Sequence, residues 1–536
     1  MKKAQVRLLC AALLLGGMHG LVWSDASDTT PTAQVDSFRI SGNTLLERAA
    51  IEAALEPYQG SRNLLELKAA AAALEALYIK AGYGGVIVYV PPQQSASGVL
   101  DITVLEGRIS RIVVLDNRRD SEGLVLRSVP GLRVGVTPRP RRIDEQIELT
   151  NQNPARQLAV TLEPGAKRGQ IEARVSVTEL PERIWSVGLD NTGNKQTGRL
   201  RTNLGFLQSN LFGLDQTFQI GAQLAPEDID SVTTVSAAWR APIYSAGLML
   251  DLQGGYSDVD GGTTSTAAGP LQFSGKGHTV GGRLTKALPR LGAFSQRLSV
   301  GLDYRDYLND CSIGGLPEGA CGSAGASVSV SPASLDYQLQ LGGRNPAVVQ
   351  LGYFANTNLF GGHADRADFE AARAGAKRSF RGERLNAQAL LALPGDTQLQ
   401  VRAAGQATRS ALVPGEQFGL AGINAVRGYQ EREVTGDQAM LLSIEFRSFD
   451  MAALSDTWID HLRWITFVDG GRVWNHEGLF CRGTRSNCTL GSAGTGFRMS
   501  LGGFQANVVL ASAFKRGNLT DRYDQFLHLQ ASYEFR

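Results

Sequence analysis

Two hydrophobic patterns divide this chain of 536 residues. Between about residues 35 and 181, short alternating runs are separated by stretches whose apolar residues recur every three or four positions, as in amphipathic helices. From residue 183 to the C-terminus the helical spacing disappears, and apolar and polar residues alternate at every second position. The change near Pro181 predicts a boundary between small α+β domains and an all-β domain.

The α+β part predicts two small domains of the same β-α-α-β-β order, at residues 35–108 and 109–181. The expected elements are a strand near 35–40, helices at 45–55 and 64–81, strands at 86–90 and 99–105, then a strand at 111–115, helices near 121–128 and 142–151, and strands near 158–162 and 170–177. Sheets this small have exposed edges. Such an edge either accepts an extended partner strand or is capped, and the sequence leaves both readings open.

The all-β part, residues 183–536, predicts an outer-membrane barrel of 16 antiparallel strands. Alternating segments occur near residues 184, 200, 218, 233, 248, 279, 298, 335, 348, 385, 399, 440, 463, 495, 505 and 527. Connections are mostly long after odd-numbered segments and short after even-numbered ones, as in barrels with long outer loops and short periplasmic turns. Two segments do not fit this pattern clearly: 366–380, which is as helical as it is strand-like, and 448–461, which is too long for a tight inner turn.

The first 24 residues have the plan of a secretory signal peptide. Lys2, Lys3 and Arg7 flank or precede an apolar stretch at 8–15, and small residues follow. The protein is therefore expected to be exported. Only about ten residues separate this peptide from residue 35, too few for a plug helix that would thread the barrel.

Four cysteines remain beyond the predicted signal peptide, and they form two close pairs in loop-like sequence. Cys311 lies ten residues before Cys321, and Cys481 lies seven before Cys488. In an oxidising compartment such pairs predict two local disulfides that staple outer loops. Metal sites have tighter spacing and nearby histidines, so we expect no metal.

Composition and charge exclude several classes of function. The formal net charge of +2 argues against a nucleic-acid surface. The six histidines are scattered, and no nucleophile motif or metal-ligand spacing occurs. Gly494 and Gly496 lie on an alternating segment, which favours lumen-facing glycines over a phosphate-binding loop. We therefore expect neither an enzyme nor a cofactor.

Two motifs after residue 410, together with the domain order, resemble the two-partner secretion transporters that export haemagglutinins and haemolysins. The motifs are VRGY, at Val426, Arg427, Gly428 and Tyr429, and FVDGG, which contains Phe467, Asp469 and Gly471. The resemblance implies two periplasmic POTRA domains ahead of the barrel. It also implies that residues 408–436 fold back into the lumen, where Arg427 meets Asp469.

The alternation agrees with this implied pairing. The apolar residues Leu462, Trp464 and Val468 share one face of their strand, which would contact lipid. The opposite face then places Asp469 in the lumen, where a charge-assisted and bidentate contact with Arg427 is expected. Gly428 would let the backbone turn sharply at the loop tip.

The resemblance implies an outer-membrane transporter that recognises an unfolded exoprotein through its POTRA domains and passes it to the cell surface. Expected partners are a secreted adhesin, haemolysin or toxin, outer-membrane lipid, and the assembly machinery during biogenesis. The C-terminal strand, with Phe535 next to the final Arg536, resembles the signature read by that machinery. Two alternatives are an assembly factor for other outer-membrane proteins, which usually has three to five POTRA units, and a passive porin, which needs no docking domains.

Overall fold

The computed structural model describes residues 32–93, 97–194, 197–229, 232–259, 263–266, 269–274, 276–308, 326–454 and 458–536. The chain divides into two compact units, one comprising Met1–Ala81 and Val86–Glu106, the other Gly82–Gly85 and Gly107–Arg536. The predicted signal peptide and the predicted Cys311–Cys321 pair lie outside the described residues.

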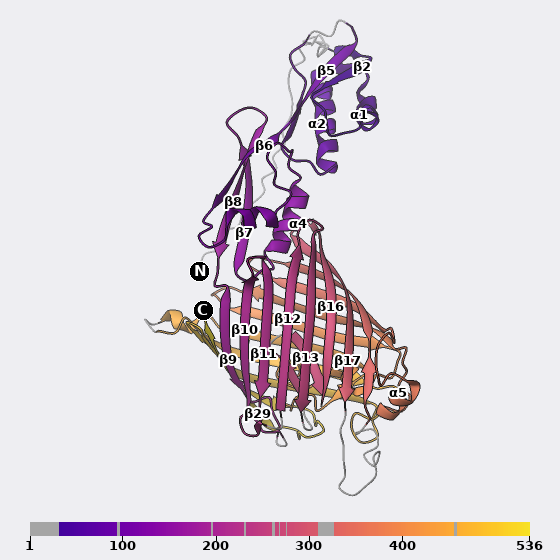
Figure 1. Cartoon of the computed structure of the whole chain (residues 1–536), viewed down its shortest axis with the longest axis vertical. Helices are drawn as coiled ribbons and strands as arrows, with labels where there is room; N and C mark the ends of the chain where they lie inside the picture. The colour runs from indigo at the N-terminus through magenta and orange to yellow at the C-terminus, as the bar shows by residue number, and fades with distance from the viewer. Residues whose placement is uncertain are drawn as a thin grey trace, which may run out of the picture. The chain divides into compact units, whose positions relative to one another are not determined.

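The first unit contains a three-stranded sheet, a separate two-stranded sheet and two helices (Figure 1). Its elements are β1 (Thr32–Val35), β2 (Ser37–Ser41), α1 (Arg48–Leu55), β3 (Gly60–Asn63), α2 (Leu64–Lys80), β4 (Val86–Tyr89) and β5 (Val99–Glu106). β2 runs parallel to the central β5, and β4 pairs with β5 on its other side. Helix α2 begins at a capping box in which Asn63 and Glu66 satisfy each other's backbone N–H groups. The strands β2 and β4 therefore form the two edges of this sheet.

The second unit begins with a domain of the same order. It contains β6 (Arg108–Leu115), α3 (Glu122–Ser128), α4 (Pro140–Thr150), β7 (Arg156–Pro164) and β8 (Gln170–Glu179). The sheet order is β6-β8-β7, with β6 parallel to β8. Ile109, Val125 and Val175 are fully buried between the sheet and the helices. We call this domain POTRA2, after the resemblance to POTRA domains given above.

The rest of the second unit is a closed barrel of 16 antiparallel strands, which confirms the predicted fold class. The strands are β9 (Arg183–Asp190), β10 (Arg201–Leu211), β11 (Gln216–Leu224), β12 (Val232–Ile243), β13 (Leu248–Val259), β16 (Lys276–Leu291), β17 (Phe294–Leu308), β18 (Val328–Val330) continued by β19 (Pro332–Leu341), β20 (Ala347–Asn356), β21 (Arg381–Ala392), β22 (Gln398–Thr408), β25 (Gln438–Arg447), β26 (His461–Trp474), β27 (Asn487–Leu501), β28 (Phe504–Ala513) and β29 (Gln525–Phe535). β29 pairs with β9 and closes the barrel. β14 (Thr263–Thr266) and β15 (Gly269–Ser274) form a separate hairpin.

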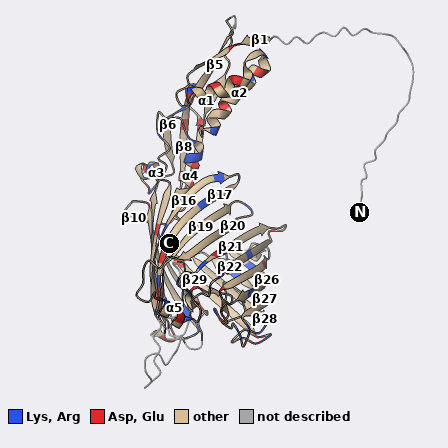
Figure 2. Cartoon of the chain, turned by 90° about the vertical axis from the view of Figure 1, so that its right-hand side faces the viewer, with Lys and Arg blue, Asp and Glu red and all other residues tan. Residues whose placement is uncertain are grey.

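The barrel wall is apolar outside and polar inside, as the alternation predicts. Trp185, Val187 and Leu189 of β9 are 43–58% exposed on the outer face. On β26, Val468 is 58% exposed whereas its neighbour Asp469 is 1% exposed in the lumen. In Figure 2 most of the barrel strands are tan, the colour of residues other than Lys, Arg, Asp and Glu. In the described part of the chain, no helix has the length and hydropathy needed to cross a membrane.

The structure resolves the two ambiguous segments. The first, 366–380, contains the short helix α5 (Arg366–Ala372), whose Phe369 is fully buried. Arg373 follows this helix and binds the fully buried Asp437 at the start of β25. The second, 448–461, contains the 3₁₀ turn η5 (Met451–Leu454). In their described residues, both segments thus form helical turns between barrel strands, and β26 begins only at His461.

POTRA2 is attached to the barrel through the turn between β10 and β11. Asp215 of this turn is 4% exposed and accepts hydrogen bonds from Asn153 and Arg156 of POTRA2 and from Tyr244 of the next turn. The amide of Asn153 also donates to the Ser209 carbonyl, at 2.7 Å. These buried polar contacts hold POTRA2 against the rim of the barrel.

A second contact joins α4 to the neighbouring ends of β16 and β17. Arg297 donates to Glu148 of α4 at 2.6 Å, and Arg290 lies 3.6 Å from the same carboxylate. Burial at this contact raises the pKa of Asp144, and the charge of Arg290 opposes that shift. POTRA2 is therefore held at two separated points of the rim, which fixes its orientation on the barrel.

Candidate gate in the barrel lumen

The connection between β22 and β25 folds into the barrel. We call residues 409–437 the inward loop. It contains the 3₁₀ turn η4 (Pro414–Glu416) and a narrow hairpin of β23 (Phe418–Gly419) and β24 (Thr435–Gly436). Its tip is closely packed: Leu420, Val426 and Tyr429 are fully buried. The loop therefore occupies the lumen as a packed plug.

Arg427 lies at the tip of the inward loop and binds Asp469 of β26. The guanidinium donates from Nε to Oδ2 at 2.7 Å and from Nη2 to Oδ1 at 2.9 Å, which is a bidentate geometry. Its backbone N–H donates to the same carboxylate at 3.2 Å. Nη1 donates to Glu445 of β25 at 2.7 Å, and Nη2 to the Ser443 hydroxyl at 3.3 Å. The arginine is 4% exposed and Asp469 is 1% exposed, so removing Arg427 would leave the Asp469 carboxylate buried without a side-chain hydrogen-bond donor among the described residues.

Phe467 and Gly471 lie on the same face of the FVDGG strand as Asp469 and shape the wall around this pair. The guanidinium carbon of Arg427 lies 3.4 Å from the centre of the Phe467 ring, a cation–π contact. A Cβ on Gly471 would lie 2.4 Å from a methyl group of Leu420, so this glycine makes room for the inward loop. Because positions two apart face the same side of a strand, all three motif residues contact the loop.

Gly494 on the neighbouring strand completes the seat. A Cβ at this position would lie 2.4 Å from the Phe467 ring and 2.3 Å from the Leu510 carbonyl oxygen. The Phe467 ring therefore has room at this position only because residue 494 has no side chain. This contact gives a physical reason for a glycine at position 494.

The remaining residues of the VRGY motif fix the tip. Gly428 has φ +87°, a conformation that other residues rarely adopt, and its N–H donates to Nε2 of His528 at 3.0 Å. The hydroxyl of Tyr429 lies 2.9 Å from the Gly491 carbonyl oxygen and 2.8 Å from that of Lys515. Val426 is fully buried in the loop core. Every member of the motif thus contacts the barrel or the core of the loop.

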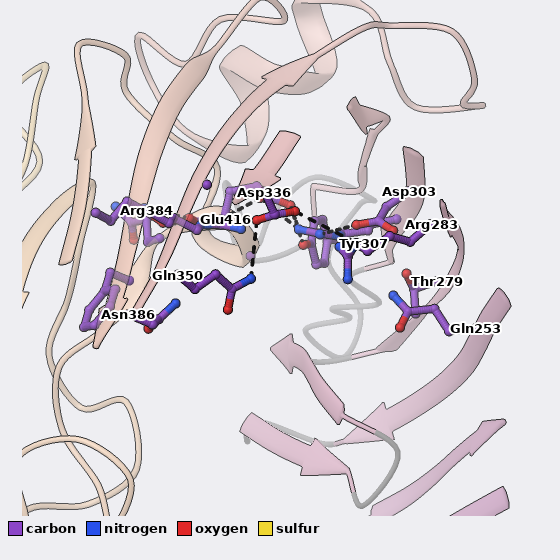
Figure 3. Close-up of a pocket in the computed structure, with 16 residues that line it drawn as sticks. Gln253, Thr279, Arg283, Asp303, Tyr307, Asp336, Gln350, Arg384, Asn386 and Glu416 are labelled. Carbon is purple, nitrogen blue, oxygen red and sulfur yellow. Dashed lines mark hydrogen bonds and ion pairs between the residues drawn. The ribbon is translucent and has the colours of Figure 1, made fainter. Parts of the chain in front are cut away.

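The base of the inward loop is anchored on a different wall, a feature that the sequence analysis missed. Glu416 is 2% exposed and accepts from Arg305 at 2.8 Å and from the Tyr307 hydroxyl at 2.9 Å, both on β17. Arg384 of β21 lies 3.5 Å from the same carboxylate (Figure 3). Since β17 and β26 are six strand positions apart, the loop spans the lumen between two ion-pair anchors.

The predicted disulfide between Cys481 and Cys488 is confirmed and contributes to the loop core. Both cysteines are buried in one cluster with Val426 and Tyr429 of the inward loop. The disulfide therefore supports the inward loop from the connection between β26 and β27.

No sequence pattern distinguished Glu416, Glu445 or His528 from other polar residues. Polar side chains are expected at every second position of a barrel strand and throughout the loops. Among the described residues, no group of acidic, histidine or cysteine side chains has the arrangement of a metal site.

Comparison with known proteins gives one family for most of the chain. A profile described as "Haemolysin secretion/activation protein ShlB/FhaC/HecB" matches residues 172–499, and one described as "POTRA domain, ShlB-type" matches residues 33–107. The outer membrane transporter CdiB of Escherichia coli O6:K15:H31 is 27% identical over 509 residues, covering 91% of this chain and 80% of that protein.

A second relative and a solved structure agree. The heme/hemopexin transporter protein HuxB of Haemophilus influenzae is 22% identical over 454 residues, covering 82% of this chain and 76% of that protein. The structure of CdiB from Escherichia coli superposes with a TM-score of 0.74 at 20% identity, covering 96% of this chain and 92% of that chain. The solved structure supports the fold of POTRA domains followed by a barrel.

Proposed function

We propose a gating mechanism for this chain, which belongs to the haemolysin secretion/activation (ShlB/FhaC/HecB) family and is an outer-membrane transporter of two-partner secretion. The inward loop is the gate. In the conformation described it is held closed by Arg427 on one wall and Glu416 on the other. An exoprotein in transit displaces the loop, so the gate is an element with two positions.

The partner is an unfolded secreted exoprotein of the adhesin, haemolysin or toxin type. We propose that it first docks in the periplasm by adding a strand to a POTRA edge, for which β2 and β4 of the first unit have the required position at the margins of their sheet. Folding of the exoprotein outside the cell would supply the driving force, because the periplasm holds no ATP. We propose no enzymatic activity, since the members of this family are transporters.

Biogenesis would use two further partners. The apolar outer face of the barrel suits the lipid of the outer membrane. The strand β29, with Phe535 exposed on the outer face, would be read by the assembly machinery. The alternative, an assembly factor, shares the barrel and both motifs, and the family profile favours the transporter.

The observation that carries the proposal is the buried, bidentate contact between Arg427 and Asp469. Arg427→Ala is expected to abolish export of the exoprotein partner while the barrel still inserts and shows a heat-dependent shift on a gel. Arg472→Ala on β26 is the matched control, because that arginine stacks on Trp474 and lies on the opposite face of the strand from Asp469 and Gly471. Unchanged levels of exoprotein in the medium of the Arg427→Ala strain would refute the proposal.

A further inference from the structure

We propose that Arg402 of β22 is the replacement cation of the gate: when Arg427 withdraws, Arg402 binds Asp469 and delays closure. This inference rests on the proposed function, because it requires that the inward loop leaves its seat. It assigns a positioning role to a residue outside both motifs.

Glu445 and Asp469 both bind Arg427, but only one of them keeps other ion-pair partners when Arg427 leaves. Glu445 keeps Arg447 at 3.0 Å and Arg498 at 3.0 Å. Asp469, by contrast, receives hydrogen bonds only from Arg427 among the described residues. Opening the gate therefore leaves Asp469 without a counter-ion, whereas Glu445 remains paired.

Arg402 lies in the right place to bind Asp469. In the strand register Arg402 is opposite Ser443, and Ser443 is opposite Asp469, so the three residues form one row across β22, β25 and β26. Neighbouring strands are about 4.8 Å apart, which separates the backbones of Arg402 and Asp469 by about 10 Å. An extended arginine side chain and a carboxylate can span that distance together. Only the short side chain of Ser443 stands between them.

Arg402 is also free to move. Among the described residues it has no hydrogen-bond or ion-pair partner, although the charges of Arg427, Asp469 and Glu445 all act on its guanidinium. It lines a cavity of about 180 Å³ together with Ile423 and Asn424 of the inward loop. Arg447 and Arg498, the other arginines nearby, are already bound to Glu445. Arg402 is thus an uncommitted cation beside the seat of Arg427.

The arrangement acts on both positions of the gate. While the gate is closed, the like charges of Arg402 and Arg427 repel each other across the cavity. While the gate is open, Arg402 neutralises Asp469 and competes with the returning Arg427. Both effects favour the open position, so loss of the Arg402 charge should shorten the time that the gate stays open.

Single-channel recording of the purified full chain in planar lipid bilayers tests this. Arg402→Gln is expected to shorten the mean open time two- to fivefold, the range that corresponds to an exposed ion pair of up to about 1 kcal/mol. Arg402→Lys, which keeps the charge, should restore most of the open time. The control Arg283→Gln removes a lumen charge on β16 that faces Asp336, and it should change conductance without changing open times.

Two backgrounds make the test specific. In Arg427→Ala channels, Arg402→Gln should no longer change the open time, because both the repulsion and the competition for Asp469 require Arg427. In Asp469→Asn channels it should shorten the open time less than in the parent, because only the competition is absent. An equal shortening in these backgrounds, or no shortening in the parent, would overturn the inference. If Arg427→Ala itself leaves gating unchanged, the proposed gate is wrong; if it alters gating while Arg402→Gln does not, only the role of Arg402 is wrong.

Discussion

The attachment of POTRA2 to the barrel depends on one buried carboxylate, and its removal is a quantitative test of the junction. In Asp215→Ala, the amide of Asn153 keeps the Ser209 carbonyl at 2.7 Å, and Arg156 keeps Asp120 at 3.0 Å. The ion pair between Arg156 and the barrel turn is lost. Breaking a buried pair costs roughly 3–5 kcal/mol, and the low end applies because Arg156 retains a partner.

A loss of about 3 kcal/mol lowers the ratio of docked to undocked POTRA2 by about a hundredfold. The second contact, between Glu148 and Arg297, remains in this variant. POTRA2 should therefore swing about α4 while staying near the rim. The change in orientation is measurable as a distance between spin labels on the exposed residues Lys167 of POTRA2 and Arg344 of a barrel turn.

The parent should give one narrow distance distribution by pulsed electron paramagnetic resonance, and Asp215→Ala a broad one. Arg174→Ala is the matched control within POTRA2, because its pairs with Glu163 and Glu172 are largely exposed and worth at most about 1 kcal/mol. Arg174→Ala should keep the narrow distribution. A narrow distribution in Asp215→Ala, identical to that of the parent, would refute the reasoning.

Two further predictions concern the contacts between the inward loop and the barrel wall. Gly494→Ala should displace the Phe467 ring and speed proteolysis within the inward loop. The control Gly188→Ala should not, because a Cβ at that position meets only ordinary contacts from 3.5 Å. Equal rates of proteolysis in the two variants would contradict the role of Gly494 in seating the loop. Replacing Cys481 and Cys488 by serine should lower the free energy of unfolding by about 2–4 kcal/mol. It should also speed proteolysis of the inward loop, because both cysteines pack against that loop. Unchanged cleavage would show that the disulfide does not support the inward loop.

The alternation along the strands predicted much of this structure, because a barrel wall between lipid and water requires a change of polarity at every residue. All 16 strands lie where the alternating segments predicted them, and the wall places Val468 outside and Asp469 inside. The segment 366–380 was ambiguous because it combines a short helix with irregular chain packed in one hydrophobic cluster, so that neither the helical nor the two-residue period extends over it.

Resemblance to a family pointed to Arg427 and Asp469, which are 42 positions apart in the sequence. No local pattern pointed to Glu416, His528 or Arg402, since lumen-facing polar residues are present on every strand of such a barrel. Their contacts depend on which strands the inward loop reaches and on the register between β22, β25 and β26. The sequence by itself thus determined the strands and which face of each one meets lipid. Only the tertiary structure decided which lumen residues bind the loop, because closing the barrel brings together side chains that are distant along the chain.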